Sequence, residues 1–261
     1  MPNSPSSSLP SSMIAAYSRI TVPLDAPLIS AQVTVQKYAC QHPGYGTGQG
    51  ERMQYKDRLL GAIGGGRGIS QNGMTASRFV GVFSGKGTMD DIATCMRLAV
   101  RHRIFHHART IAADAPLPYQ RLLQRVADDY IGLDCNGFVG NWAIYNSVPG
   151  ASASHFPLDW LSGRVPRRTL ADLQQYDVVV WAGGTHIGMI ETLGSLAADG
   201  RSRSVDFAES SRGGMVLHRG TQISLLRTAA ATPRGMAAPF SLHNDIHGHD
   251  AVVIVSMARG H

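Results

Sequence analysis

The sequence predicts an α+β fold in which helices precede an antiparallel sheet. Two segments, 88–112 and 117–131, carry the apolar spacing of helices. The last third of the chain instead contains four short apolar segments of strand composition: 177–182, 186–193, 203–210 and 251–259. A run of helices followed by a run of strands is typical of α+β domains.

The composition indicates a folded chain with many turns. Of the 261 residues, 43% are hydrophobic and 16% are charged, which suffices for one large domain or for an ordinary core with an added region. The 29 glycines favour loops over a helical bundle.

The net charge of +6 favours acidic partners such as nucleic acid, anionic lipid or wall polymer, or else a solvated basic surface. We expect no nucleic acid, because the arginines are scattered and no nucleic-acid-binding motif occurs.

Residues 1–24 are rich in proline and serine, and we expect them to form a flexible leader. They lack the basic and then apolar regions of a secretory signal. The chain contains no apolar run of about 18 residues, so we expect no membrane span. We therefore expect the protein to be made in the cytoplasm and to leave the cell by a non-classical route or by lysis.

Residues 25–116 form an N-terminal region of unknown role. Within it we expect strands over 28–38 and 77–85, and a glycine-rich loop over 41–73. The loop contains GAIGGGRG, which lacks the lysine and hydroxyl residue of a phosphate-binding loop.

The helix expected from Thr88 has a clear N-terminal signal. Asp90 and Asp91 lie in its first turn, where a negative charge favours the helix dipole. Its apolar face has the spacing i, i+3, i+4, i+7: Ile92, Cys95, Met96 and Ala99. The second helix is expected over 117–131.

Cys135 stands where a third helix is expected to begin, in the segment DCNGFVGNWAIYNSV. Backbone N–H groups at a helix N-terminus stabilise a thiolate, and they can also hold the oxyanion of an acyl-transfer transition state. Gly137 permits close approach of a substrate. Cys135 is therefore a candidate nucleophile, and a cysteine packed in the core is the alternative.

His186 begins an apolar strand directly after the turn at 182–184, Ala-Gly-Gly. At that place a histidine can face a cleft while its neighbours are buried. A cysteine nucleophile needs such a base, which forms a thiolate–imidazolium pair and later protonates the leaving amine. A purely structural histidine is the alternative.

Together these segments resemble the NlpC-type papain-like cysteine peptidases, a family of peptidoglycan amidases and endopeptidases. Residues 134–139, DCNGFV, are similar to the family's Asp-Cys-Ser-Gly-Phe-Val motif. Residues 176–181, YDVVVW, and 185–190, THIGMI, are similar to its Gly-Asp-Leu-Val-Phe-Phe and His-Val-Gly-Ile-Tyr strands. The resemblance covers 117–261, which we take as the catalytic core.

The resemblance implies a papain-like α+β core, with the helix that bears the cysteine packed on an antiparallel sheet that bears the histidine. It implies that Cys135 is the nucleophile and His186 the base. It also implies hydrolysis of peptide amides in peptidoglycan without a metal or organic cofactor. Asp134, Asn136 and Gly137, which flank the nucleophile in the motif, become the candidate substrate-binding residues.

The sequence departs from the family at three positions. Asn136 replaces a serine, and Tyr176 replaces a glycine. The third catalytic position, often a histidine on the strand after the base, is here Glu209 or Asp206, which lie on opposite faces of a regular strand. The turn signal at Asp199 and Gly200 favours pairing His186 with Glu209 over pairing it with Asp206.

Two further groups could carry other chemistry. The segment 243–250, HNDIHGHD, could bind zinc through its histidines and aspartates, although no matching ligands stand out elsewhere. Cys40 and Cys95 are either two buried thiols or a disulfide.

The expected function is hydrolysis of peptidoglycan stem peptides or cross-links, by an antibacterial toxin or a phage lysin. An immunity protein or a delivery protein is then the expected protein partner. The alternative is a papain-like toxin that modifies a protein or lipid by deamidation, transamidation or acyl transfer. A third alternative is a degenerate relative that only binds wall fragments or a partner.

Overall fold

The computed structural model describes residues 9–24, 30–35, 45–109, 111–112, 118–211 and 214–259. The chain divides into two compact units. Ser12–Asp134 form most of the first, and Cys135–Ser210 with Met215–His261 form most of the second.

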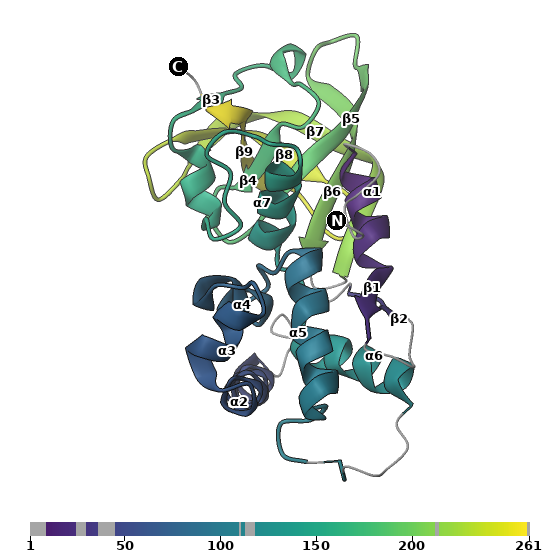
Figure 1. Ribbon diagram of the computed structural model, residues 1–261. Helices are drawn as coiled ribbons and strands as arrows, with labels where there is room; N and C mark the ends of the chain where they lie inside the picture. The colour runs from purple at the N-terminus through teal and green to yellow at the C-terminus, as the bar shows by residue number, and fades with distance from the viewer. Residues whose placement is uncertain are drawn as a thin grey trace. The chain divides into compact units, whose positions relative to one another are not determined.

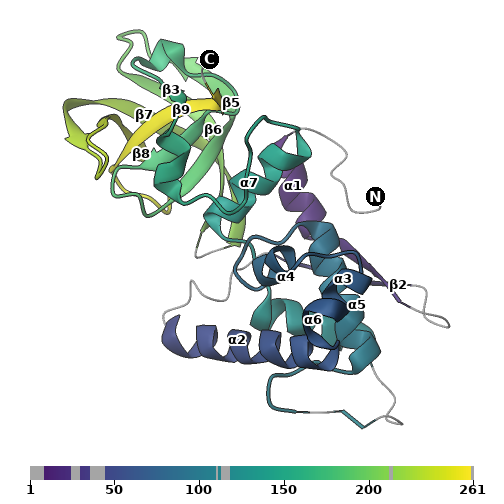
Figure 2. The same cartoon turned by 60° about the vertical axis from the view of Figure 1, so that its left-hand side comes forward.

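The first unit is mainly helical (Figure 1). The two short strands pair antiparallel, with Ile20 opposite Val33, and they pack on α5 and α6. Helices α2, α5 and α6 pack on one another (Figure 2). The elements are α1 Pro10–Tyr17, β1 Ile20–Pro23, β2 Ser30–Val33, α2 Tyr45–Ala62, α3 Gly65–Gln71, α4 Ala76–Val82, α5 Met89–His102 and α6 Tyr119–Tyr130.

The expected leader is partly ordered. Residues 1–8 lie outside the described residues, but α1 and β1 occupy most of 9–24. Met13 and Tyr17 are fully buried, and the Tyr17 hydroxyl donates a hydrogen bond to the carbonyl of Gly87. This apolar face anchors the segment despite its proline and serine content.

Two expectations for 41–85 differ from the structure. Helices α2 and α3 occupy most of the expected loop, because Tyr55 and Leu59, one turn apart, are buried and their packing overrides the low helix propensity of glycine. The strand expected over 77–85 is helix α4. Thr75 caps its N-terminus by accepting a hydrogen bond from the Arg78 N–H, and Phe79 is buried on its inner face.

The two helices expected from their apolar spacing are α5 and α6. Thr88 caps α5 by accepting from the Asp91 N–H. The helix ends earlier than expected, at His102, because Arg103 adopts a left-handed conformation with φ 56°. Among the described residues, no helix is both long and apolar enough to cross a membrane.

The second unit is a helix followed by a closed antiparallel barrel. The strands run in the order β3-β9-β4-β5-β6-β7-β8, and β8 also pairs with β9, which closes the last six strands into a ring. Phe240 lies opposite Val252 across this closing pair. The elements are α7 Cys135–Tyr145, η2 Pro157–Leu161, β3 Arg164–Pro166, η3 Leu170–Asp172, β4 Val178–Trp181, β5 Ile187–Leu196, β6 Ser202–Ser211, β7 Gly214–Ala231, β8 Ala237–His243 and β9 Asp250–Arg259.

The predicted papain-like α+β core is wrong, because the sheet closes into a six-stranded barrel. The four expected strands exist as β4, β5, β6 and β9, but β7 and β8 were not expected. These two strands bridge β6 to β9 and so complete the ring.

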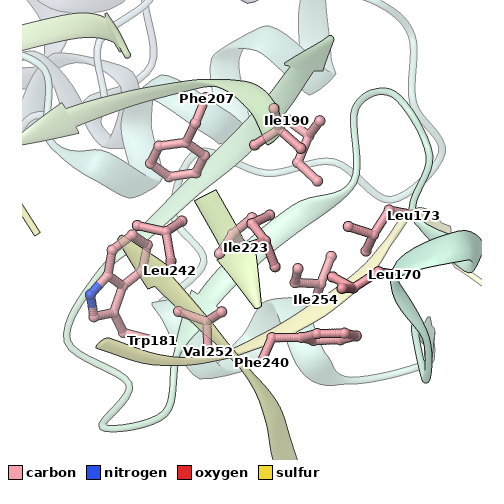
Figure 3. Packing of buried hydrophobic residues seen from close by; sticks show 12 residues of the cluster. Leu170, Leu173, Trp181, Ile190, Phe207, Ile223, Phe240, Leu242, Val252 and Ile254 are labelled. Carbon is pink, nitrogen blue, oxygen red and sulfur yellow. The ribbon is translucent and has the colours of Figure 1, made fainter. Parts of the chain in front are cut away.

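The barrel is filled by inward-facing side chains that alternate along the strands (Figure 3). Trp181 of β4 and Phe207 of β6 contribute large aromatic rings. The core cluster consists of Leu170, Leu173, Val179, Trp181, Ile190, Val205, Phe207, Ile223, Phe240, Leu242, Val252 and Ile254.

One glycine is required by the packing of the barrel. Gly188 of β5 lies opposite Glu209 of β6. A Cβ at Gly188 would overlap the ring of Phe207 and lie 2.8 Å from the carbonyl oxygen of Ala208. The missing side chain therefore lets β5 and β6 keep the register that sets the position of Glu209.

Candidate active site

Cys135 is the first residue of α7 and is buried. The Asn136 Nδ2 donates to its Sγ at 3.7 Å, and the Asn136 Oδ1 is buried without a hydrogen-bond partner among the described residues. The thiol thus lies beside the N–H groups of a helix N-terminus and one side-chain donor.

His186 lies one residue before β5 and is held by a tight turn after β4. The Gly184 N–H donates to the Trp181 carbonyl at 2.8 Å, and the Trp181 N–H donates to the His186 carbonyl at 3.1 Å. Gly184 adopts φ 68°, and a Cβ there would collide with Leu158. The turn therefore fixes the direction in which the imidazole leaves the strand.

His186 contacts a buried carboxylate and interacts with the Cys135 thiol. Burial lowers the pKa of His186, but hydrogen bonds with Cys135 and Glu209 raise it to about 10. The Nε2 donates to Glu209 Oε2 at 2.7 Å, which leaves Nδ1 as the ring nitrogen available to the thiol. The protonated ring is favoured because it lies between two groups that can carry a negative charge.

Glu209 lies on the inward face of β6, two residues after Phe207, and its side chain is fully buried. Burial raises its pKa, but hydrogen bonds from His186, His218 and His247 lower the pKa far below its usual value. His218 Nε2 lies 3.1 Å from Oε1, and His247 Nε2 lies 3.0 Å from both oxygens. Three imidazole donors thus compensate a carboxylate that is fully buried.

Asp206, the other candidate for the third position, has different partners. Its Oδ2 accepts from the Thr192 hydroxyl at 2.9 Å, and its Oδ1 accepts from the Gly220 N–H at 3.1 Å. The structure brings Glu209, and not Asp206, to His186. In the structure Glu209 lies opposite Gly188, whereas the turn signal suggested that it would lie opposite His186, two residues earlier in the chain.

Trp181 contacts His186 and His247, and Asp250 contacts Trp181 and His247. The Trp181 ring lies 4.7 Å from the His186 ring and 4.8 Å from the His247 ring, measured between centroids. Its Nε1 donates to Asp250 Oδ2 at 3.0 Å, and the same oxygen lies 3.3 Å from His247 Nδ1. His247 is therefore held between two carboxylates, those of Asp250 and Glu209.

The three candidate substrate-binding residues have different surroundings. Both Asp134 oxygens contact Lys86 Nζ, at 2.8 and 2.6 Å, so this carboxylate is already paired within the first unit. Asn136 contacts the thiol, as described above. Gly137 is buried in the first turn of α7.

The histidine-rich segment 243–250 does not act as one cluster. The rings of His243 and His249 stack with centroids 4.5 Å apart, and both residues are exposed. Only His247 of this segment turns toward Glu209. His218 was missed by sequence reasoning because it lies in β7, where no strand was expected.

Cys95 is a free thiol buried in α5, and Cys40 lies outside the described residues. Burial, together with the nearby Asp91, raises the pKa of the Cys95 thiol well above its usual value. A neutral, buried thiol of this kind is chemically inert.

The site brings together a thiol, an imidazole and a buried carboxylate at one end of the barrel. No family model matches the chain, and no curated protein or solved structure matches it either.

Proposed function

We propose that the protein is a cysteine-dependent amide hydrolase that cleaves the stem peptides or cross-links of peptidoglycan. The observation that carries the proposal is that His186 lies 2.7 Å from the buried Glu209 carboxylate and that both Glu209 and the Cys135 thiol raise the pKa of this imidazole. In this proposal Cys135 is the nucleophile, His186 is the base and acid, and Glu209 orients the imidazole.

The reaction proceeds in two halves. The Cys135 thiolate attacks the amide carbonyl carbon and forms a tetrahedral oxyanion. The C–N bond then breaks, the His186 imidazolium gives its proton to the departing amine, and a thioester remains on Cys135. A water molecule, deprotonated by His186, attacks the thioester, releases the carboxylic acid and regenerates the thiolate–imidazolium pair.

The remaining groups have roles that follow from their positions. Glu209 stays ionised and holds the Nε2 proton of His186, so Nδ1 faces the reacting atoms throughout. Backbone N–H groups at the start of α7 stabilise the oxyanion. The unpartnered amide oxygen of Asn136 is suited to accept a hydrogen bond from a substrate N–H.

The substrate class rests on the motif similarity to NlpC-type peptidases. Tyr176 supports it locally, because φ of 69° at this position is a conformation that favours glycine, the residue of the family motif. The net charge of +6 adds some support, since stem peptides and wall polymers carry carboxylates and phosphates. An antibacterial toxin or a phage lysin, released by a non-classical route or by lysis, fits this substrate, and an immunity or delivery protein fits as its partner.

The test is to identify the new chemical ends in fragments that the protein releases from purified sacculi. Mass spectrometry should find free stem peptides or opened cross-links with new carboxyl and amino ends, and intact glycan linkages. Intact sacculi alongside deamidation or acylation of a protein target would instead support a toxin that acts on proteins. Glycan cleavage would overturn the amide reaction.

A further inference from the structure

We propose that His186, Glu209 and His247 also form a transition-metal site, suited to Zn²⁺, and that an ion bound there switches off the thiol chemistry. Metal binding itself is independent of the proposed hydrolase function, whereas the inhibition rests on it.

The three side chains meet at one end of the barrel. His186 comes from the start of β5, Glu209 from β6 and His247 from the connection between β8 and β9. Their ligand atoms all lie within 4.8 Å of one another. Imidazole nitrogens and carboxylate oxygens are ordinary zinc ligands, and two histidines with one glutamate form a known zinc set.

The present distances are those of hydrogen bonds. Glu209 Oε2 lies 2.7 Å from His186 Nε2 and 3.0 Å from His247 Nε2. Zinc bonds of about 2.0–2.1 Å in a tetrahedral arrangement require ligand atoms to lie about 3.3 Å apart. The side chains would therefore separate by a few tenths of an ångström as the ion replaces the protons between them.

The surroundings would hold these ligands in place. His247 Nδ1 faces Asp250 Oδ2 at 3.3 Å, which is the carboxylate–histidine arrangement that orients zinc-bound imidazoles. His218 Nε2 contacts Glu209 Oε1 at 3.1 Å and leaves Oε2 for the ion. Each histidine that binds Zn²⁺ gives up its Nε2 proton to solvent, so the metal replaces two protons beside a buried anion.

The inhibition follows from proton balance on one ring. His186 has Nε2 toward Glu209, which leaves Nδ1 for the thiol. With a metal on Nε2, the neutral ring keeps its proton on Nδ1. Giving that proton to a leaving amine would create an imidazolate, and the same ring cannot accept a proton from water. The metal-bound centre therefore lacks its acid and its base.

The experiment uses the full chain after treatment with EDTA and removal of the chelator. Titration with Co²⁺, read by its visible absorption, and with Zn²⁺, read by calorimetry, should give one site per chain. His247→Ala should weaken the affinity by at least about tenfold. His247→Gln, which keeps a hydrogen-bond donor near Glu209, should do the same if the first variant misfolds. His243→Ala, in the exposed stacked pair, should leave the affinity unchanged.

Cys135→Ala should still bind one ion, because the thiol is not among the ligands. This arm remains informative even if the hydrolase proposal fails. Absence of one-site binding, or equal affinity in the His247 variants, would overturn the metal site. If Zn²⁺ binds but neither hydrolysis nor alkylation of Cys135 is lost, the proposed inhibition is overturned. If hydrolysis strictly requires Zn²⁺, the proposed hydrolase mechanism is overturned, while the metal site remains.

Discussion

The Nε2 of His186 lies 2.7 Å from Oε2 of Glu209, a carboxylate that is fully buried at the end of the barrel. An ionised carboxylate without water is costly unless charged or strong donors surround it. Three imidazoles, those of His186, His218 and His247, surround the Glu209 carboxylate. Because Nε2 of His186 contacts Glu209, Nδ1 is the ring nitrogen left for Cys135. One buried carboxylate thus joins three imidazoles at this end of the barrel and orients the His186 ring.

The two described cysteines should differ strongly in reactivity. Cys135 lies beside His186 and a helix N-terminus, whereas burial keeps the Cys95 thiol neutral. Iodoacetamide at neutral pH should label Cys135 faster than Cys95 by at least about tenfold, as measured by peptide mass spectrometry of the folded protein. Faster labelling of Cys95 would remove Cys135 from its assigned role.

Replacing Glu209 by glutamine should slow hydrolysis without a large change in side-chain volume. The neutral amide cannot stabilise the imidazolium of His186, and we expect kcat to fall by about 100-fold or more. Asp206→Asn, whose side chain has other partners on β6, is the matched control and should stay within about threefold of the parent. Equal losses in both variants would show that Glu209 has no special role.

Stability should fall as the pH rises above neutrality. The pKa of His186 is about 10 in the folded protein and about 6.5 when unfolded, so the folded state binds the proton more tightly. This contribution is fully present below pH 6.5 and is lost as the pH rises through 10. Denaturant unfolding in EDTA should show the decline, and His186→Ala should reduce it, whereas the exposed His243→Ala should not. A decline unchanged by His186→Ala would contradict the assigned ionisation.

Gly188 should tolerate no side chain. The Cβ of Gly188→Ala would overlap the Phe207 ring across β5 and β6, so we expect a loss of about 1–3 kcal/mol in the free energy of unfolding. Gly248→Ala is the control, because nothing lies within 4 Å of its Cβ position. Denaturant titrations of the two variants measure the difference. A Gly188→Ala protein as stable as the control would mean that β5 and β6 pack less closely than described.

Part of this structure could be predicted from the sequence. The helix from Thr88 carries a strong N-terminal signal, and the capped start of α5 is where that signal places it. The strand with Glu209 follows the strand with His186 after a clear turn. Glu209 and Asp206 lie on opposite faces of that strand, so only one of them can face His186. These features depend on local patterns, which a single sequence displays.

The closure of the barrel could not be predicted in the same way. β7 mixes buried and exposed positions without regular alternation, and β8 buries three consecutive residues, 240–242, so neither has the period of a half-buried strand. The pairing of β8 with β9 depends on the whole sheet. His218 and His247 lie in or next to these strands, which explains why their approach to Glu209 was not foreseen.

The most direct test of the central claim compares the release of stem peptides from purified sacculi by the protein and by Cys135→Ala, both in EDTA. The thiol is the nucleophile in this account and a metal is not required. The parent should therefore be as active with EDTA as without it, and Cys135→Ala should release no peptides above background while it unfolds at a similar denaturant concentration. Hydrolysis by a folded Cys135→Ala protein, or loss of the parent's activity in EDTA with recovery on adding Zn²⁺, would contradict the account.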